Sequence, residues 1–518
     1  MIFLLLTVAI ATYYVYHWTF WKRRGMPGPW GIPIFGKSGT MLEDRVSPPL
    51  VIQKWTEKYG KVFGFTEGMQ KVMVISDPDM VQEVFVKQYD NFFGRKLNPI
   101  QGDPDNDKDV PIVGAQGFRW KRLRTISAPA FSNNSIKKVL GSIEDSTLEF
   151  MKHLEQKGAN GKAVNMHIFF QEYTMDVIMR IAMGQQGSKM FNNPLLYDCK
   201  GFFENNRWPI WMFSGAFPFA VKVLKYIFLK LGKFGAAPFI KVQKTVTDAV
   251  MERIAQREAD QKQGIEPGEP QDFIDLFLDA KTDVEHFGET NEEFHKSTIY
   301  NNRKLTTPEI ITNCFIFVVA GFDTTAISLS YVAYFLSLNP RVQRKLQEEV
   351  DRECPDQEIS FDQLSKLKYM ENTIKEALRV FPMAAFANSR RCMRTTKIGD
   401  QLVEEGTDIL VDTWTLHHDK KTGKVFLKNL KTSNLTIIIF RWEAPLTPHQ
   451  AFMSFGAGPR QCLGMRLAYL EQKNLLAHVL RKYSFVANMQ TQVPMKLVGR
   501  ATSRPESLML SVEPRNGM

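Results

Sequence analysis

Over most of the chain, apolar and polar positions alternate with the period of helices. A long apolar run at 310–338 predicts a buried helix, and the pattern at 465–483 predicts another. At 61–76 the apolar residues fall in short clusters typical of strands, whereas helical patterns dominate from about residue 77 onward. The stretch 97–117 is rich in Gly, Pro and Asp and is predicted to be a loop. The chain is therefore expected to be mainly α with small β-sheets.

The first 20 residues contain no Asp, Glu, Lys or Arg. About 20 apolar residues are enough to cross a bilayer as a helix. Tyr and Trp gather at the end of this run, and Trp21-Lys22-Arg23-Arg24 follows, so the positive charges would keep the rest of the chain in the cytosol. A cleaved signal peptide is the alternative, but it fits poorly because the basic residues come after the apolar run. We expect 1–20 to be a transmembrane anchor.

Composition narrows the partners that the chain is expected to bind. Hydrophobic residues make up 44% and aromatic residues 12% of the 518 residues, which is enough for a large core. The formal net charge is +11, and because no nucleic-acid motif accompanies it, an anionic membrane surface or an acidic protein partner is favoured over nucleic acid. Five cysteines without CxxC spacing argue against a zinc site or a disulfide scaffold.

The segment 455–464, FGAGPRQCLG, carries the most specific chemistry. It places Cys462 in a glycine-rich loop before a predicted helix, where peptide dipoles and free N–H groups favour a thiolate. Gly456, Gly458 and Gly464 would allow tight turns and close approach to a flat partner. Arg460 could bind a carboxylate, so that the set suits the iron and propionates of haem. An inert, buried cysteine is the alternative.

This segment resembles the haem-binding signature of the cytochrome P450 family, Phe-Gly-x-Gly-x-Arg-x-Cys-x-Gly, at all six specified positions. The resemblance extends over nearly everything after about residue 26. It is closest in character to the microsomal members that oxidise xenobiotics and lipids, vertebrate family-3-like and nematode relatives among them. It implies the P450 fold with an N-terminal transmembrane helix. Residues 21–36 would be a basic, proline-rich hinge and 37–518 a single haem-thiolate catalytic domain.

Three further motifs occur in the order that this family has. Trp120 and Arg124 resemble its Trp-x-x-x-Arg, and spacing i,i+4 puts both on one helix face, where they can donate to a propionate. Asp323 and Thr324 lie in an Ala-Gly-x-Asp-Thr-Thr segment, where a threonine bonded to the preceding turn can distort the helix. The third motif is the Glu-x-x-Arg of residues 376–379. Read alone, the first pattern also fits a basic amphipathic turn, and the second fits a hydrogen-bonded polar kink without chemistry. The third also fits a solvated ion pair on the surface.

The resemblance implies a role for each of these residues. Haem b (iron protoporphyrin IX) would have Cys462 as its axial thiolate, and Asp323 and Thr324 would deliver protons to dioxygen. The residues expected to bind the cofactor are Trp120, Arg124, Arg390, Phe455, Gly458, Arg460, Cys462 and Gly464. The residues expected to form a structural ion-pair cluster behind the haem are Glu376, Arg379 and Arg441.

One segment departs from the family pattern. Between Asp419 and Trp442 the family's Pro-Glu before the arginine is absent, and the run is several residues too long. It is first basic and then strongly apolar at 435–440. Because a haem site depends on the contacts that support it, we expect that this chain binds haem weakly.

The expected function is that of a haem-thiolate monooxygenase of the endoplasmic reticulum membrane, facing the cytosol. It would insert one oxygen atom into a xenobiotic, fatty acid or steroid-like molecule. NADPH would supply electrons through a cytochrome reductase, with cytochrome b5 as a second candidate partner, because the chain has no nucleotide-binding fingerprint.

The docking charges are expected to be Lys121, Arg122, Arg466 and Lys473. The aromatic and lysine-rich stretch 202–239 is expected to dip into the membrane interface, with plain core as its alternative. The alternative functions are a reductase-independent isomerase or lyase of the same fold, and a chain impaired by 420–440.

Overall fold

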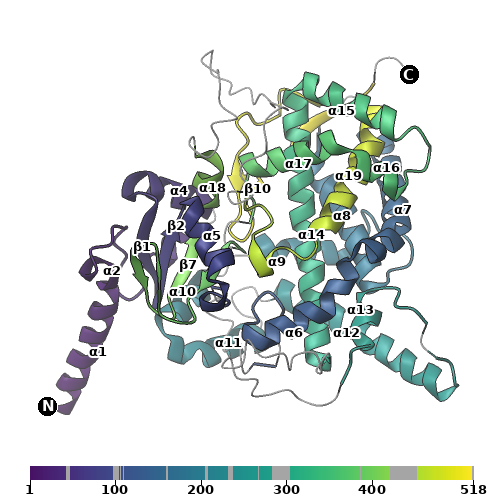
Figure 1. The fold of residues 1–518 in the computed structure, drawn as a ribbon. Coiled ribbons are helices and arrows are strands. Elements are labelled where there is room, and N and C mark those ends of the chain that lie inside the picture. The colour runs from purple at the N-terminus through teal and green to yellow at the C-terminus, as the bar shows by residue number, and fades with distance from the viewer. Residues whose placement is uncertain are drawn as a thin grey trace.

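The computed structural model describes residues 1–41, 47–96, 104, 107–108, 110–158, 162–204, 208–231, 237–266, 268–282, 304–384, 387–419 and 452–515. A sheet-rich part formed mostly by the N-terminal segment lies beside a larger helical part (Figure 1). The mainly helical architecture with small sheets agrees with the sequence prediction.

Four strands form the largest sheet, in the order β1-β2-β7-β4. Strands β1 (Val62–Glu67) and β2 (Gln70–Ile75) make an antiparallel hairpin. Strand β7 (Asp408–Val411) runs parallel to β2, and β4 (Ser389–Arg391) runs antiparallel to β7. The hairpin confirms the strand prediction for 61–76, and the sheet brings Arg390, which is far along the chain, next to the N-terminal segment.

The other strands form small sheets. These are β3 (Val164–Asn165), β11 (Met509–Pro514) and β8 (Tyr483–Ala487) in one sheet, β5 (Thr396–Ile398) with β6 (Gln401–Val403), and β9 (Leu497–Val498) with β10 (Arg504–Pro505). Only β9–β10 bears on the site, because the turn between these two strands reaches the central helix.

The central helix of the fold is α14 (Thr307–Leu338), which confirms the helix predicted at 310–338. Thr306 and Glu309 close its N-terminus with a capping box. Helix α8 (Met166–Met183) packs along it in the opposite direction, since His167 contacts Ser330 at one end of the crossing and Ile178 contacts Gly321 at the other. A Cβ on Gly321 would lie 2.7 Å from Ile178, so glycine allows this close approach.

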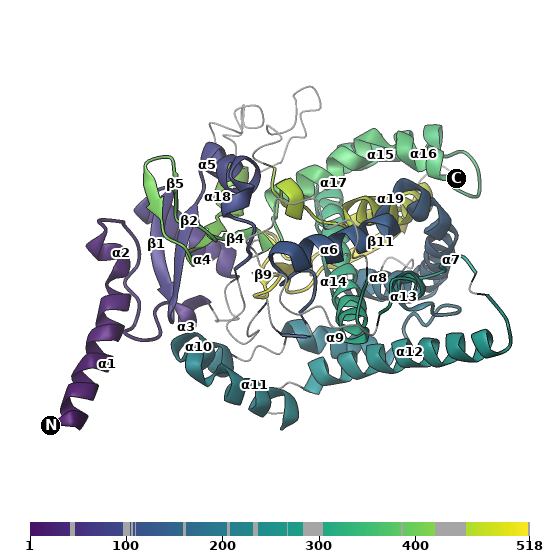
Figure 2. The same ribbon diagram turned by 60° about the horizontal axis from the view of Figure 1, so that its bottom comes forward.

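The other helices either pack around this pair or lie beside the sheet-rich part (Figures 1 and 2). They are α4 (Pro48–Tyr59), α5 (Pro78–Gln82), α6 (Gly117–Ser127), α7 (Asn133–Lys157), α9 (Pro194–Glu204), α10 (Trp208–Ala216), α11 (Val221–Lys230), α12 (Ala237–Lys262), α13 (Phe273–Leu278), α15 (Pro340–Glu353), α16 (Phe361–Lys366), α17 (Lys368–Val380), α18 (Thr413–His418) and α19 (Met465–Lys482). The bounds of α19 confirm the helix predicted at 465–483 to within one residue.

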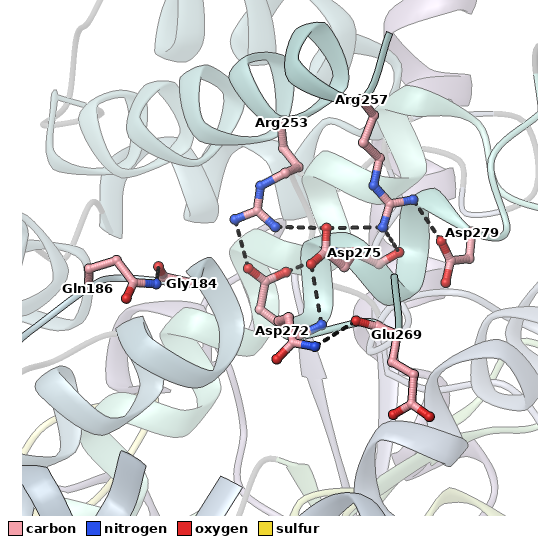
Figure 3. Close-up of polar contacts among 9 residues, drawn as sticks. Gly184, Gln186, Arg253, Arg257, Glu269, Asp272, Asp275 and Asp279 are labelled. Carbon is pink, nitrogen blue, oxygen red and sulfur yellow. Dashed lines mark hydrogen bonds and ion pairs between the residues drawn. The ribbon is translucent and has the colours of Figure 1, made fainter. Parts of the chain in front are cut away.

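The C-terminal half of α12 is attached to α13 by a network of ion pairs (Figure 3). Arg253 contacts Asp272 and Asp275 at 2.9 and 2.7 Å, and Arg257 contacts Asp275 at 3.0 Å. Gly184, the left-handed residue that ends α8, fits beside this network only because it lacks a side chain, since a Cβ would lie 2.2 Å from a carboxylate oxygen of Asp272. The network therefore joins α12 to α13, and the end of α8 packs against it.

The N-terminal segment begins with helices α1 (Ile2–Trp18), α2 (Phe20–Arg23) and α3 (Ser38–Met41). No residue of α1 is buried, whereas Phe20 and Trp21 are packed against the sheet. The indole N–H of Trp21 donates to the carbonyl oxygen of Phe65 at 2.8 Å. Among the described helices, the 17-residue α1 is apolar but shorter than a full span, and α14, which is long enough, is a mostly buried core helix.

Candidate functional site

Cys462 lies in a tight loop between the 3-10 turn Gly458–Arg460 and the start of α19. Its backbone N–H donates to the carbonyl oxygen of Phe455 at 2.8 Å, which closes the loop. Gly458 has φ +68°, and a Cβ there would lie 2.0 Å from the carbonyl oxygen of Phe85. Glycine is therefore required at this position. Gly464 differs from the expectation, because its φ of −84° and the space around it would accept a side chain.

The environment of the Cys462 thiol has opposing effects on its ionisation. Burial deep in the protein raises its pKa, although one face of the side chain remains accessible. The N–H groups of Gly464 and Met465 at the start of α19, and the charges of Arg124 and Arg95, act in the other direction. These are the groups that would stabilise a thiolate once a cation takes the accessible face of the sulfur.

Four arginines form a cluster around this loop: Arg390 and Arg460 are buried, and Arg95 and Arg124 are half-buried. Burial and the repulsion of Arg95 lower the pKa of Arg460 to about 9, and the same two causes lower that of Arg390 well below its usual range. Arg390 and Arg460 are 1% and 4% exposed. Arg95 was not predicted from the sequence, because no motif marks it.

None of the four arginines has a carboxylate partner within the described part of the chain. The buried Nε atoms of Arg95, Arg390 and Arg460 lack any hydrogen-bond acceptor. Two backbone carbonyls, those of Ser389 and Ala457, accept from Arg390. Unpaired buried cations are costly, so this cluster fits a ligand that carries carboxylates, as the propionates of haem do.

Trp120 forms one wall of the cluster. It is 6% exposed on α6, and the guanidinium of Arg460 lies 4.6 Å from its ring centroid. Arg124, one turn further along α6, is half-buried and lies 5.9 Å from the same ring. The structure thus brings together Trp120, Arg124, Arg390 and Arg460, which the sequence analysis assigned to one binding site from three separate segments of the chain.

The middle of α14 combines an open face with a buried acid. Ala320 is exposed and Thr324 half-exposed in a helix whose other central residues are mostly buried. The Thr324 hydroxyl donates to the Ala320 carbonyl oxygen at 2.7 Å, as predicted for a threonine that bonds back to the preceding turn. Asp323 is 1% exposed and lies between α8 and the turn that joins β9 to β10. The two polar residues therefore face different surroundings.

A rigid polar cluster supports the cysteine loop from behind. Arg379 contacts Glu376 with two nitrogens at 2.7 and 2.8 Å, which makes the pair bidentate. It also donates to the backbone of His417, whose Nε2 accepts from the N–H of Met453. Burial lowers the pKa of His417 to about 3, so its ring is neutral. The sequence analysis did not predict His417, and Arg441, its proposed third member, lies outside the described residues, as does the whole segment 420–440.

Two of the four predicted docking charges are wrong. Arg122 is 4% exposed and pairs with Glu309 at 2.8 Å, and Lys473 is 5% exposed and pairs with Glu371 at 2.8 Å. Both positions face the core because α6 and α19 turn these sides toward α14 and α17. Arg466 is exposed and Lys121 half-buried, so these two remain candidates.

Comparison with known proteins adds two findings. Residues 26–512 match the family model described as Cytochrome P450. Among curated proteins of Caenorhabditis elegans, the chain is 69% identical to cytochrome P450 CYP13A8 over 99% of this chain and 100% of the relative. It is 53% identical to CYP13A1 and 51% identical to CYP13A10, each over 98% of both chains.

Proposed function

Since the chain belongs to the cytochrome P450 family and is thus a haem monooxygenase, we propose that it oxidises a lipophilic small molecule at a membrane, with Cys462 as the axial thiolate. The reaction would convert R–H, O2, NADPH and H⁺ into R–OH, H2O and NADP⁺, so that two electrons reach the site from NADPH. The substrate class proposed is a xenobiotic, a fatty acid or a steroid-like molecule.

The observation that carries this proposal is the group of four arginines beside Cys462, two of them fully buried, with no carboxylate of the described chain to pair with. Arg95, Arg390 and Arg460 would hold the propionates with Trp120 and Arg124, and Phe455, Gly458 and Gly464 would shape the loop against the cofactor. When bound, haem supplies dioxygen activation, which a cysteine thiolate ligand promotes. The bidentate pair of Glu376 and Arg379 would keep the loop in place from behind.

Asp323 and Thr324 are proposed to move protons. The side chain of Thr324 lies on the open face of α14, where its hydroxyl is already hydrogen-bonded to Ala320 and can take part in a chain with water. Burial raises the pKa of Asp323, so its carboxyl group keeps a proton to higher pH than an exposed aspartate does and can pass that proton on. These residues also argue against the isomerase or lyase alternative, because a peroxide rearrangement does not need protons delivered from solvent.

A membrane location is supported by two apolar surfaces on the same side of the molecule. Helix α1 projects from the body near α10 and α11 (Figures 1 and 2), and the Tyr14 hydroxyl donates to the Ala216 carbonyl at 3.2 Å. Phe219, in the 3-10 turn Pro218–Ala220 between α10 and α11, is 82% exposed. Val223, in α11, is 62% exposed. We propose that α1 is a membrane anchor, that 21–36 connect it to a catalytic domain over 37–518, and that the protein resides in the endoplasmic reticulum facing the cytosol.

A groove of about 690 Å³ lies on the cysteine side and is a candidate docking surface for a reductase. Phe455 and Gln461 line it from the loop, and Lys368, Lys375 and Arg466 contribute positive charge. An acidic surface of NADPH–cytochrome reductase or of cytochrome b5 would complement these charges. Electron entry on this side would be close to Cys462, because Gln461, the residue before it, lines the groove.

The first experiment is the carbon monoxide difference spectrum of the reduced, recombinant full-length protein. A strongly red-shifted haem band is expected, because it reports thiolate ligation, and Cys462→Ser should abolish it without abolishing folding. Absence of the band in a folded protein would contradict the assignment and support the reading in which the segment 420–440 impairs haem binding. Product formation that persists without NADPH and reductase would instead favour the isomerase or lyase alternative.

A further inference from the structure

The two oxygens of the Asp323 carboxyl group are each held by a different part of the fold. The side-chain amide of Gln171, on α8, donates to one oxygen at 3.0 Å. The hydroxyl of Thr502, in the turn between β9 and β10, donates to the other at 3.1 Å. Gln171 and Thr502 are 4% and 6% exposed, so that both hydrogen bonds are shielded from bulk water. Neither residue belongs to a motif that the sequence analysis singled out.

Both donors are placed by backbone features with little freedom. Helix α8 lies close to α14 because Gly321 leaves room for Ile178, and this crossing sets Gln171 opposite Asp323. The turn that carries Thr502 is fixed at Gly499, whose φ is +94° and whose Cβ would lie 2.4 Å from the Thr502 carbonyl oxygen. The next residue, Ser503, bonds through its backbone to Met383 and Tyr331.

We propose that Gln171 and Thr502 are positioning residues for the proposed proton relay: together they fix the Asp323 carboxyl group away from the open face of α14 and set how readily it takes up and releases a proton. The inference rests on the proposed function, in which Asp323 supplies protons. Of the two, only Thr502 can accept a hydrogen bond as well as donate one through the same atom, so its hydroxyl is the point at which a proton can pass to Asp323.

The charges around Asp323 act in the same direction as these two donors. Burial raises the pKa of Asp323, and the hydrogen bond from Gln171, the charge of Arg504, the hydrogen bond from Thr502 and the charge of Lys200 partly offset that rise. The other titratable groups that face it are Cys199 on α9 and Tyr331 on α14, and burial raises the pKa of each, so both stay neutral. Loss of either hydrogen bond should therefore raise the pKa of Asp323 further.

The test uses Gln171→Leu and Thr502→Val, with Thr502→Ser as the variant that keeps the hydroxyl. In the full-length haem-loaded protein with reductase, each of the first two variants should lower product formed per NADPH consumed by roughly three- to tenfold. Haem content should stay unchanged, and Thr502→Ser should resemble the wild type. In the Asp323→Asn background neither substitution should cause a further loss, because the acid that would relay the proton has already been removed. Equal losses in both backgrounds, or a Thr502→Ser protein as impaired as Thr502→Val, would overturn the proposal.

A second readout does not depend on activity. The melting temperature of the same proteins is compared at pH 5 and pH 8. A hydrogen bond to a charged carboxylate is stronger than one to a neutral carboxyl group, so Gln171→Leu and Thr502→Val should lower the melting temperature more at pH 8 than at pH 5. This pH dependence should disappear in the Asp323→Asn background. If the wild type gave no NADPH-dependent product, the proposed function would fail, but the melting temperatures would still decide whether these residues hold Asp323. A decrease in melting temperature that is the same at both pH values would refute the proposal that Gln171 and Thr502 hold the Asp323 carboxyl group.

Discussion

Arg379 and His417 each donate a hydrogen bond to the backbone carbonyl oxygen of the other, at 2.8 and 3.1 Å. Glu376 occupies the remaining face of the Arg379 guanidinium, and the second ring nitrogen of His417 accepts from Met453, which precedes the cysteine loop. The helix α17, the helix α18 and the loop that carries Cys462 are thus connected through two side chains. His417 therefore supports the loop together with the Glu-x-x-Arg pair.

His417→Phe should weaken haem retention. The phenyl ring fills a similar volume but leaves the buried N–H of Met453 without an acceptor, at a cost of about 1–3 kcal/mol. We expect a lower melting temperature and a faster loss of haem to an excess of apomyoglobin. His418→Phe is the control, because that neighbouring side chain is only partly buried and bonds locally to Trp414. Equal effects of the two substitutions would contradict a special role for His417.

Arg95→Met should have opposite effects on the protein without and with haem. Without haem it removes one of several repelling buried cations, so the apoprotein should become more stable. With haem it removes a charge-assisted hydrogen bond worth about 1.5–3 kcal/mol, so haem affinity should fall roughly 10- to 100-fold. Melting temperatures of both forms measure this. Arg466 is exposed and lies outside the cluster, so Arg466→Met should change neither the stability of the apoprotein nor the haem affinity. A destabilised apoprotein would show that Arg95 has a purely structural role.

Asp408→Asn should stabilise the protein at high pH. Burial raises the pKa of Asp408 to about 7, because Lys96 and Arg391 only partly compensate and Glu67 adds to the rise. Both carboxylate oxygens are buried without a hydrogen-bond partner. The folded state therefore holds a proton that the unfolded state releases near pH 4, so stability falls as pH rises from about 4 to about 7. The difference in unfolding free energy between variant and wild type should grow to a few kcal/mol between pH 5 and pH 8. A difference that does not change with pH would refute the assignment.

Gly184→Ala should destabilise the protein more than Gly187→Ala. Both glycines have φ +67°, so both substitutions pay the cost of a left-handed residue, about 1–2 kcal/mol. Only at Gly184 would the new methyl group also meet Asp272 and Arg253, at 2.2 and 2.8 Å, whereas nothing lies within 4 Å at Gly187. The two melting temperatures separate the steric effect from the backbone effect. Equal shifts would mean that the ion-pair network of Figure 3 moves aside without cost.

Features that depend on local patterns were predicted well. The helices at 307–338 and 465–482 and the strands over 62–75 were recognised because the period of apolar residues reports directly which face of an element is buried. The back-bonded Thr324 also follows from its neighbours along the helix alone. In contrast, the burial of Arg122 and Lys473 could not be seen, since a basic residue on an amphipathic helix looks the same whether it faces solvent or a carboxylate from another helix.

By itself, the sequence determined the family, the cysteine proposed as the haem ligand and the order of the motifs, because each of these is written in residues that are close together along the chain. The tertiary structure decided which groups meet: Arg95 with Arg390 and Arg460, His417 with Arg379, and both Gln171 and Thr502 with Asp323. These contacts join segments separated by tens to hundreds of residues. Their energies depend on burial and on distance between charges, and both quantities exist only once the helices have packed.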